Sequence, residues 1–448
     1  MDFQAFKEAV IAQCEKLGIG DYELYYQWGE STSISAFRHE VNQFTSSVEG
    51  GVCFRCIVGG KMGYASTEEL SGEQAISIVE RAADNAAVLE NNDPVFLGEG
   101  GQSYERISPI SYPLPDTEAL LSTVLDTQEK IYAADPAVID GSTTQGIRES
   151  SEIAIYNSRG LDLQYACRTS GLVVAAVVSD GSQMSNDFQI KLGQLDTMDR
   201  DALVKKAVTA ALAKMGGDDA PTGVFPVVFS PEAMTSLLQT FSGIFSSEAT
   251  QKGLSKLAGK EGTAIAAPCV TIIDDPFHCD NPMPIPFDAE GSPTACKCVV
   301  ENGVLQTLLY NLKTANLAGK KTTGNASKAG YNAAVKVRPF TMYLAPGELS
   351  EEALLRKAEK GIYIDTLEGL HAGANAVSGD FSLQSAGYLI ENGAKTKHIK
   401  AFTVAGNFYV LLQNITAVAS NMTLPRALGM TAFGAPSVLV EGLSIAGK

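Results

Sequence analysis

The sequence predicts an α+β fold: an N-terminal α/β domain with an antiparallel meander, and a C-terminal domain in which helices flank an antiparallel sheet core. Two observations support this prediction. Strand-like segments separated by turn residues follow one another between residues 142 and 190, which is typical of a meander. The second half contains the pairs Asn302-Gly303 and Asn392-Gly393, which are typical of tight β-hairpins.

Apolar residues at helical spacing predict the helices of the first half. One begins at the N-terminus, a second follows the N-cap residue Ser71, and a third begins near Asp116 and ends before Pro136. A fourth is expected over residues 199–215. The apolar stripe of the first helix consists of Phe3, Phe6, Val10, Cys14 and Leu17.

The strands expected in the first half are short. Gly59-Gly60 predicts a hairpin that joins residues 52–58 to residues 62–65. Alternating and β-branched residues predict the other strands, which are 22–28, 32–37, 153–156, 161–168, 172–178 and 188–192.

The polar, glycine-rich segment 216–223 is the most linker-like part of the chain. It predicts a domain boundary, so the expected domains are residues 1–219 and 220–448. The second domain opens with a strand over 225–229 and a helix that Ser230 caps. Further helices are expected over 310–318 and 349–360.

Composition limits the classes of function. The chain has 448 residues and a formal net charge of −17, which disfavours direct binding to nucleic acid or to an anionic membrane surface. Its longest apolar runs are too short to span a membrane, and its first residues do not resemble a signal peptide. Eight cysteines are too few for a disulfide scaffold. We therefore expect a cytoplasmic protein with reduced thiols.

Ordinary catalytic motifs do not assign an activity. His278 and Cys279, with Cys296 and Cys298 downstream, offer side chains that bind transition metals, but the spacing is unlike that of common zinc sites. A loop histidine with free thiols is the alternative interpretation. The acids Asp274, Asp275, Asp288 and Glu290 could form a catalytic carboxylate pair, although clustered acids are also expected by chance in so acidic a chain.

A series of motifs, distributed over nearly the whole chain, resembles the TldD/PmbA family in order and spacing. In the first half the similar segments are GVCFR at 51–55 and GYAS at 63–66. The similar segments of the second half are 274–276, 287–291, 299–305, 323–326, 378–382, 388–393, 434–437 and 443–447.

The resemblance implies one of two subunit types. The TldD type is a zinc peptidase with an HExxxH motif on a helix and a late cysteine, whereas the PmbA or TldE type lacks this site and pairs with the first. The positions that correspond to the two histidines and the glutamate are Gln239, Ile244 and Thr240, and no cysteine follows Cys298. These residues cannot supply the zinc ligands or the general base of the family, so the chain resembles the PmbA/TldE type.

The resemblance therefore implies a subunit that is catalytically silent alone and helps to form the chamber for proteolysis of unfolded peptides. Zinc is expected in a TldD-type partner, with which this chain would form a heterodimer. A homodimer of this chain is the other option. The family's older label is modulator of DNA gyrase. The alternative is a self-sufficient homodimeric metallopeptidase or hydrolase with a relocated site near His278 and Glu290. The residues expected at a peptide cleft are Asp275, Asp288, Glu290, Gly291, Gly324 and Asn325.

Overall fold

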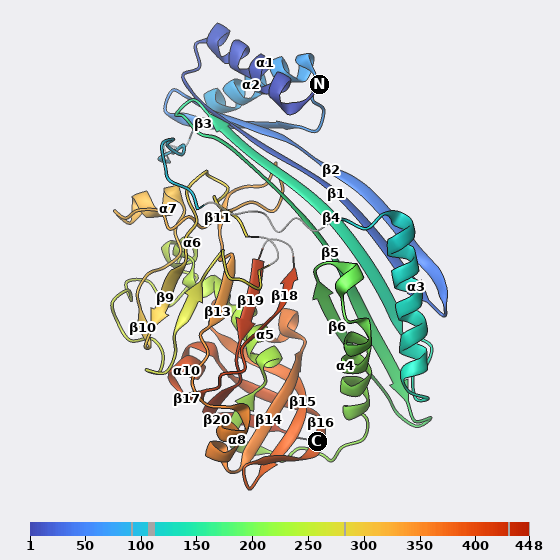
Figure 1. The fold of residues 1–448 in the computed structure, drawn as a ribbon. Coiled ribbons are helices and arrows are strands. Elements are labelled where there is room, and N and C mark those ends of the chain that lie inside the picture. The colour runs from blue at the N-terminus through green and yellow to red at the C-terminus, as the bar shows by residue number, and fades with distance from the viewer. Residues whose placement is uncertain (91–92, 106–112, 282–283, 429–430, 448) are drawn as a thin grey trace.

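A long, twisted antiparallel sheet forms the upper side of the molecule in the computed structural model, and the second half of the chain packs beneath it (Figure 1). The strand order is β3-β2-β1-β4-β5-β6. The structure describes residues 1–90, 93–105, 113–281, 284–428 and 431–447. The six strands are β1 (Asp21–Phe37), β2 (Glu40–Val58), β3 (Lys61–Thr67), β4 (Thr143–Asn157), β5 (Asp162–Ser179) and β6 (Met184–Leu192).

Four helices accompany this sheet, in two pairs (Figure 1). The helices α1 (Phe3–Leu17) and α2 (Gly72–Val88) lie at one end of it, and α3 (Thr117–Ala134) and α4 (Arg200–Ala213) lie toward the other. Each begins where a side-chain oxygen accepts a hydrogen bond from a free backbone N–H of the first turn. The capping residues are Asp2, Ser71, Asp116 and Asp199.

The structure corrects the predicted strand lengths. β1 runs without a break where two strands were expected, and so does β5, because pairing to neighbours on both sides compensates for their polar residues. The first part of β2, residues 40–51, was not predicted at all. Its side chains are mostly exposed and polar, so no alternation of apolar and polar residues marks it as a strand.

Two further sheets build the second half, with orders β10-β9-β8-β13-β19-β18 and β16-β15-β14-β7-β20-β17. Most pairings are antiparallel as predicted, but β13–β19 and β14–β7 are parallel. A short pair joins β11 (Ala326–Ser327) to β12 (Lys336–Val337). The remaining strands are β7 (Gly223–Phe229), β8 (Ile272–Asp274), β9 (Lys297–Glu301), β10 (Val304–Leu305), β13 (Thr341–Leu344), β14 (Gly361–Glu368), β15 (Asp380–Glu391), β16 (Ala394–Asn407), β17 (Ile415–Val418), β18 (Thr423–Leu428), β19 (Thr431–Ala435) and β20 (Val438–Ala446).

The predicted hairpins of this half are confirmed. Asn302 and Asn392 both have positive φ angles, as do the glycines that follow them, which is the backbone geometry of a tight turn. The three predicted helices of this half are present as α5 (Pro231–Phe241), α7 (Leu312–Leu317) and α8 (Glu351–Ala358), and the last two are shorter than expected. The short helices η2 (Ser242–Phe245), α6 (Ser247–Gln251), α9 (Leu370–Gly373) and α10 (Phe408–Gln413) were not predicted.

The largest apolar core surrounds α5, between the two C-terminal sheets. Leu237, Leu238 and Phe241 of this helix are fully buried, and Phe241 stacks on Phe408 of α10 at 4.7 Å between ring centroids. Ser230 caps the helix as predicted, with Oγ accepting a hydrogen bond from the Ala233 N–H. Burial of this kind stabilises a domain by about 25 cal/mol per Å² of apolar surface, so α5 is a central packing element.

Candidate functional site

The acidic segment that the sequence analysis selected folds into buried loops. Asp274 is fully buried, and Oδ1 accepts hydrogen bonds from the N–H groups of Phe340 and Thr341 at 2.9 Å each. Its Oδ2 accepts from Asn325 Nδ2 at 2.8 Å and lies 3.1 Å from Lys297 Nζ. A buried carboxylate with four such partners fixes the chain around it.

Asp288 has a similar role in the next loop. Its Oδ1 accepts hydrogen bonds from the N–H groups of Glu290 and Ser292, and its Oδ2 accepts one from Ala326 at 2.9 Å. Burial, together with the neighbouring Glu290 carboxylate, raises the pKa of Asp288 to about 7. The carboxylate therefore ties the loop to strand β11.

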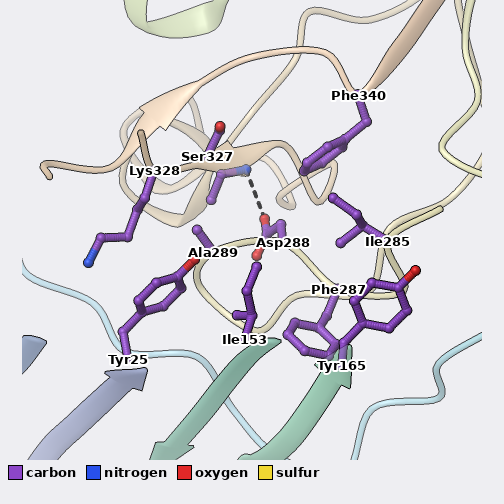
Figure 2. Close-up of a pocket in the computed structure, with 11 residues that line it drawn as sticks. Tyr25, Ile153, Tyr165, Ile285, Phe287, Asp288, Ala289, Ser327, Lys328 and Phe340 are labelled. Carbon is purple, nitrogen blue, oxygen red and sulfur yellow. Dashed lines mark hydrogen bonds between the residues drawn. The ribbon is translucent and has the colours of Figure 1, made fainter. Parts of the chain in front are cut away.

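A small cavity of about 10 Å³ lies between this loop and the long sheet (Figure 2). Figure 2 shows Tyr25 and Tyr165 of the sheet at the bottom of the view, with Phe287 beside Tyr165, and Ile285 and Phe340 of the loops above them. The cavity has room for about one water molecule, so it cannot accommodate a peptide.

Glu290 lies where the second half meets the long sheet. Its carboxylate accepts a hydrogen bond from the Leu312 N–H at 2.8 Å. On the sheet side, Arg55 forms a buried ion pair with Glu23, in which Nη2 and Oε1 are 2.6 Å apart. Burial raises the pKa of Glu290, and the nearby Arg55 guanidinium opposes this rise. These charges join the two halves of the chain.

The other residues expected at a peptide cleft also shape loops. Asp275 accepts a hydrogen bond from the Phe277 N–H at 3.0 Å, and Asn325 donates to Asp274 and to the Arg338 carbonyl. Gly291 and Gly324 have φ angles of 75° and 68°, which favour glycine. A role in peptide contact stays a prediction for all six residues, and within this structure Asp288, Glu290 and Asn325 are buried.

The residues that the family resemblance matched to zinc ligands and a general base lie in or beside the α5 core. Ile244 is 1% exposed and lies in η2, after α5 has ended at Phe241. The Thr240 hydroxyl donates to the Ser236 carbonyl at 2.8 Å, and Gln239 is exposed. The Ile244 side chain is a hydrocarbon, the Thr240 hydroxyl is hydrogen-bonded within the helix, and Gln239 offers only an amide. These three side chains therefore do not form a zinc site. Gly429 and Met430, in the stretch without the family's late cysteine, lie outside the described residues.

A large groove, which the sequence analysis did not predict, separates the central part of the chain from the second half. It encloses about 1060 Å³. Residues of β6 and β18, each the last strand of its sheet, line the groove together with Ser230 and Pro231 at the start of α5. Its lining includes the charged residues Lys191, Asp199, Lys206, Glu232, Asp280 and Asp365.

His278 and Glu290 have separate surroundings. The imidazole of His278 packs edge-on against Tyr343 with ring centroids 5.1 Å apart, whereas Glu290 contacts Leu312 and lies near Arg55. The two side chains share none of these neighbours. A relocated catalytic site that uses both residues therefore has no geometric support among the described contacts.

The α+β scaffold is that of a class of proteins that includes metallopeptidases. Three family models match this chain: PmbA/TldA metallopeptidase domain 1 over residues 22–86, the central domain over 110–215 and the C-terminal domain over 222–447. The chain belongs to the PmbA/TldD family. The resemblance inferred from its motifs is thereby confirmed, while the expected boundary between residues 219 and 220 stays a prediction.

Individual relatives agree with this family. A metalloprotease of Methanothermobacter thermautotrophicus is 27% identical over 86% of this chain and 85% of its own length. A metalloprotease PmbA homologue of Haemophilus influenzae is 24% identical over 87% of this chain and 85% of its own length.

Two solved structures share the fold. A Thermotoga maritima protein that carries the provisional name modulator of a DNA gyrase has a TM-score of 0.89 and 30% identity, and covers 99% of this chain and all of its own. TldE from Thermococcus kodakarensis has a TM-score of 0.86 and 24% identity, with 99% of this chain and all of its own covered. In the part of the present chain that the structure describes, we find no helix that could cross a membrane.

Proposed function

We propose that this chain is the PmbA/TldE-type subunit of a two-subunit metallopeptidase, and that it has no zinc site of its own at the family position. The packing of Ile244 into the α5 core is the observation on which this proposal depends. A side chain buried among Leu237, Leu238 and Phe241 stabilises the helix and has no free atom for a metal. The zinc would be supplied by a TldD-type partner, in a cytoplasmic complex.

The groove supports a role in holding the substrate. Extended peptides commonly bind by adding a strand to a free sheet edge, and β6 and β18 both end their sheets beside the groove. Backbone hydrogen bonds of this kind do not depend on sequence, so they suit an unfolded peptide. The buried loops around Asp274 and Asp288 would then keep β13 and the neighbouring strands in place.

Co-expression with the TldD-type subunit of the same cell tests the proposal. We expect the two chains to co-purify, and we expect the partner to cleave an unfolded peptide faster when this chain is present. Zinc content and cleavage rate of the partner would be measured with and without this chain. An unchanged rate and unchanged zinc content would contradict the subunit role. Recovery of this chain solely as a homodimer would contradict the heterodimer.

A further inference from the structure

Three adjacent side chains at the edge of the groove form a compact set of possible metal ligands. One ligand atom from each of His278, Cys279 and Asp280 lies within 4.8 Å of the other two. Cys279 and Asp280 are exposed and also line the groove. They follow β8, so a fixed strand positions the loop that presents them.

The orientation of His278 suits this arrangement. Its ring is held edge-on by Tyr343, and its side chain is 15% exposed. Nδ1 accepts a hydrogen bond from the Asp280 N–H at 3.2 Å and lies 3.9 Å from Asp280 Oδ2. Nδ1 therefore lies beside Asp280, and a metal ion would replace the N–H as its partner.

The sheet fixes the ring that contacts His278. Tyr343 lies on β13 and pairs with Ile273 of β8, which pairs in turn with Cys298 of β9. Directly paired residues lie on the same face of a sheet, so three strands hold the Tyr343 ring in place beside the imidazole.

The chemistry of these ligands favours a particular class of ion. Thiolate and imidazole together bind Zn²⁺ and similar thiophilic cations, whereas Mg²⁺ and Ca²⁺ prefer oxygen ligands alone. In a tetrahedral zinc site the bonds are about 2.0–2.3 Å long, so the ligand atoms are roughly 3.3–3.8 Å apart. Exposed side chains can close the remaining distance by rotation.

We propose that His278, Cys279 and Asp280 bind a thiophilic divalent cation such as Zn²⁺ at the edge of the groove. The ion would hold these three side chains together and so fix the part of the groove wall that Cys279 and Asp280 line. This site is separate from the family's zinc position at Gln239, Thr240 and Ile244, and it does not depend on the proposed subunit role.

Cobalt binding to the full chain tests the proposal. The chain is stripped of metal, kept reduced without thiol reagents, and titrated with Co²⁺, and the thiolate-to-cobalt charge-transfer absorption is recorded. We expect one equivalent to bind with this absorption and Zn²⁺ to displace it. Affinity should fall at least about tenfold in Cys279→Ser and His278→Ala.

Matched controls separate this site from adventitious binding. Cys269→Ser removes another exposed thiol, His371→Ala removes another exposed histidine, and Gln239→Ala alters the family position. All three should bind Co²⁺ like the unmodified chain. Absence of the charge-transfer absorption, or unchanged affinity in Cys279→Ser and His278→Ala, would overturn the proposal.

Discussion

The acidic loops and the groove differ in what their polar groups do. In the loops, the carboxylates of Asp274 and Asp288 are buried, and each accepts several hydrogen bonds from the chain itself. In the groove, charged side chains such as Lys206 and Asp280 line an open volume of about 1060 Å³. The residues that carry the family resemblance in these loops therefore contribute to the scaffold. Residues outside those motifs line the space that a peptide could enter.

The largest expected effect is the loss of a buried carboxylate from the loops. Asp274→Ala leaves the buried N–H groups of Phe340 and Thr341 without an acceptor and the Lys297 ammonium without its partner. We expect the free energy of unfolding to fall by about 3–5 kcal/mol, measured by urea denaturation. Asp280→Ala, at an exposed acid of the groove, should change it by less than about 0.5 kcal/mol. Equal losses in the two variants would remove the distinction between loops and groove.

A second effect concerns the core around Ile244, a position that the family resemblance matched to a metal ligand. Ile244→His places an imidazole in an apolar core, where burial of a polar group is unfavourable, and we expect the free energy of unfolding to fall by about 2–4 kcal/mol. Gln239→His, at an exposed position of the same segment, should cost less than about 1 kcal/mol. Thermal unfolding of both variants measures the difference. If Ile244→His unfolds at the same temperature as the unmodified chain, the Ile244 side chain is not required for packing of the core.

A pH dependence follows from the buried pair Asp288 and Glu290. The pKa of Asp288 is about 7 in the folded chain, against about 3.9 in an unfolded one. The folded state binds this proton more tightly than the unfolded state does. The proton on Asp288 therefore contributes to the free energy of unfolding below about pH 4, and this contribution is lost as the pH rises toward 7.

Glu290→Gln removes the neighbouring charge and should make this loss smaller, by on the order of 1–2 kcal/mol between pH 5 and 7.5. Unfolding midpoints at the two pH values measure it. Glu301→Gln, at an exposed acid, should keep the pH dependence of the unmodified chain. If the unmodified chain, Glu290→Gln and Glu301→Gln all show the same dependence of stability on pH, the Glu290 carboxylate does not affect the titration of Asp288.

The smallest expected change in stability is in the groove. Thr423→Trp on β18 fills the groove with a bulky side chain at an exposed position, so stability should change by less than about 0.5 kcal/mol. Binding of an unfolded fluorescent peptide by the complex should weaken about tenfold, which corresponds to about 1.4 kcal/mol. Val88→Trp, at an exposed residue outside the groove lining, is the matched control. Unchanged peptide binding in Thr423→Trp would place the peptide elsewhere.

Local signals in the sequence predicted much of the fold. The caps Ser71 and Ser230 and the turns at Asn302 and Asn392 depend on residues next to one another, so each could be identified directly. The first part of β2 could not, because its exposed polar residues form a strand only through pairing with β1. The parallel pairs β13–β19 and β14–β7 join distant segments and leave no local pattern.

Less of the candidate site than of the fold could be predicted from the sequence. The family resemblance drew attention to Asp288 and Glu290, whose burial depends on contacts with the long sheet and with Leu312. The groove is lined by segments near residues 190, 230, 280 and 423, which only the folded chain brings together. By contrast, the adjacency of His278, Cys279 and Asp280 was visible in the sequence, although the contact between His278 and Tyr343 was not.

Peptidase activity of the purified chain alone, with added Zn²⁺, tests whether this chain has a catalytic metal site of its own. We expect no cleavage of an unfolded peptide, even if zinc binds beside Cys279, and cleavage once the TldD-type partner is added. Cleavage by the chain alone that a chelator stops, and that Gln239→Ala or Thr240→Ala abolishes, would contradict this expectation.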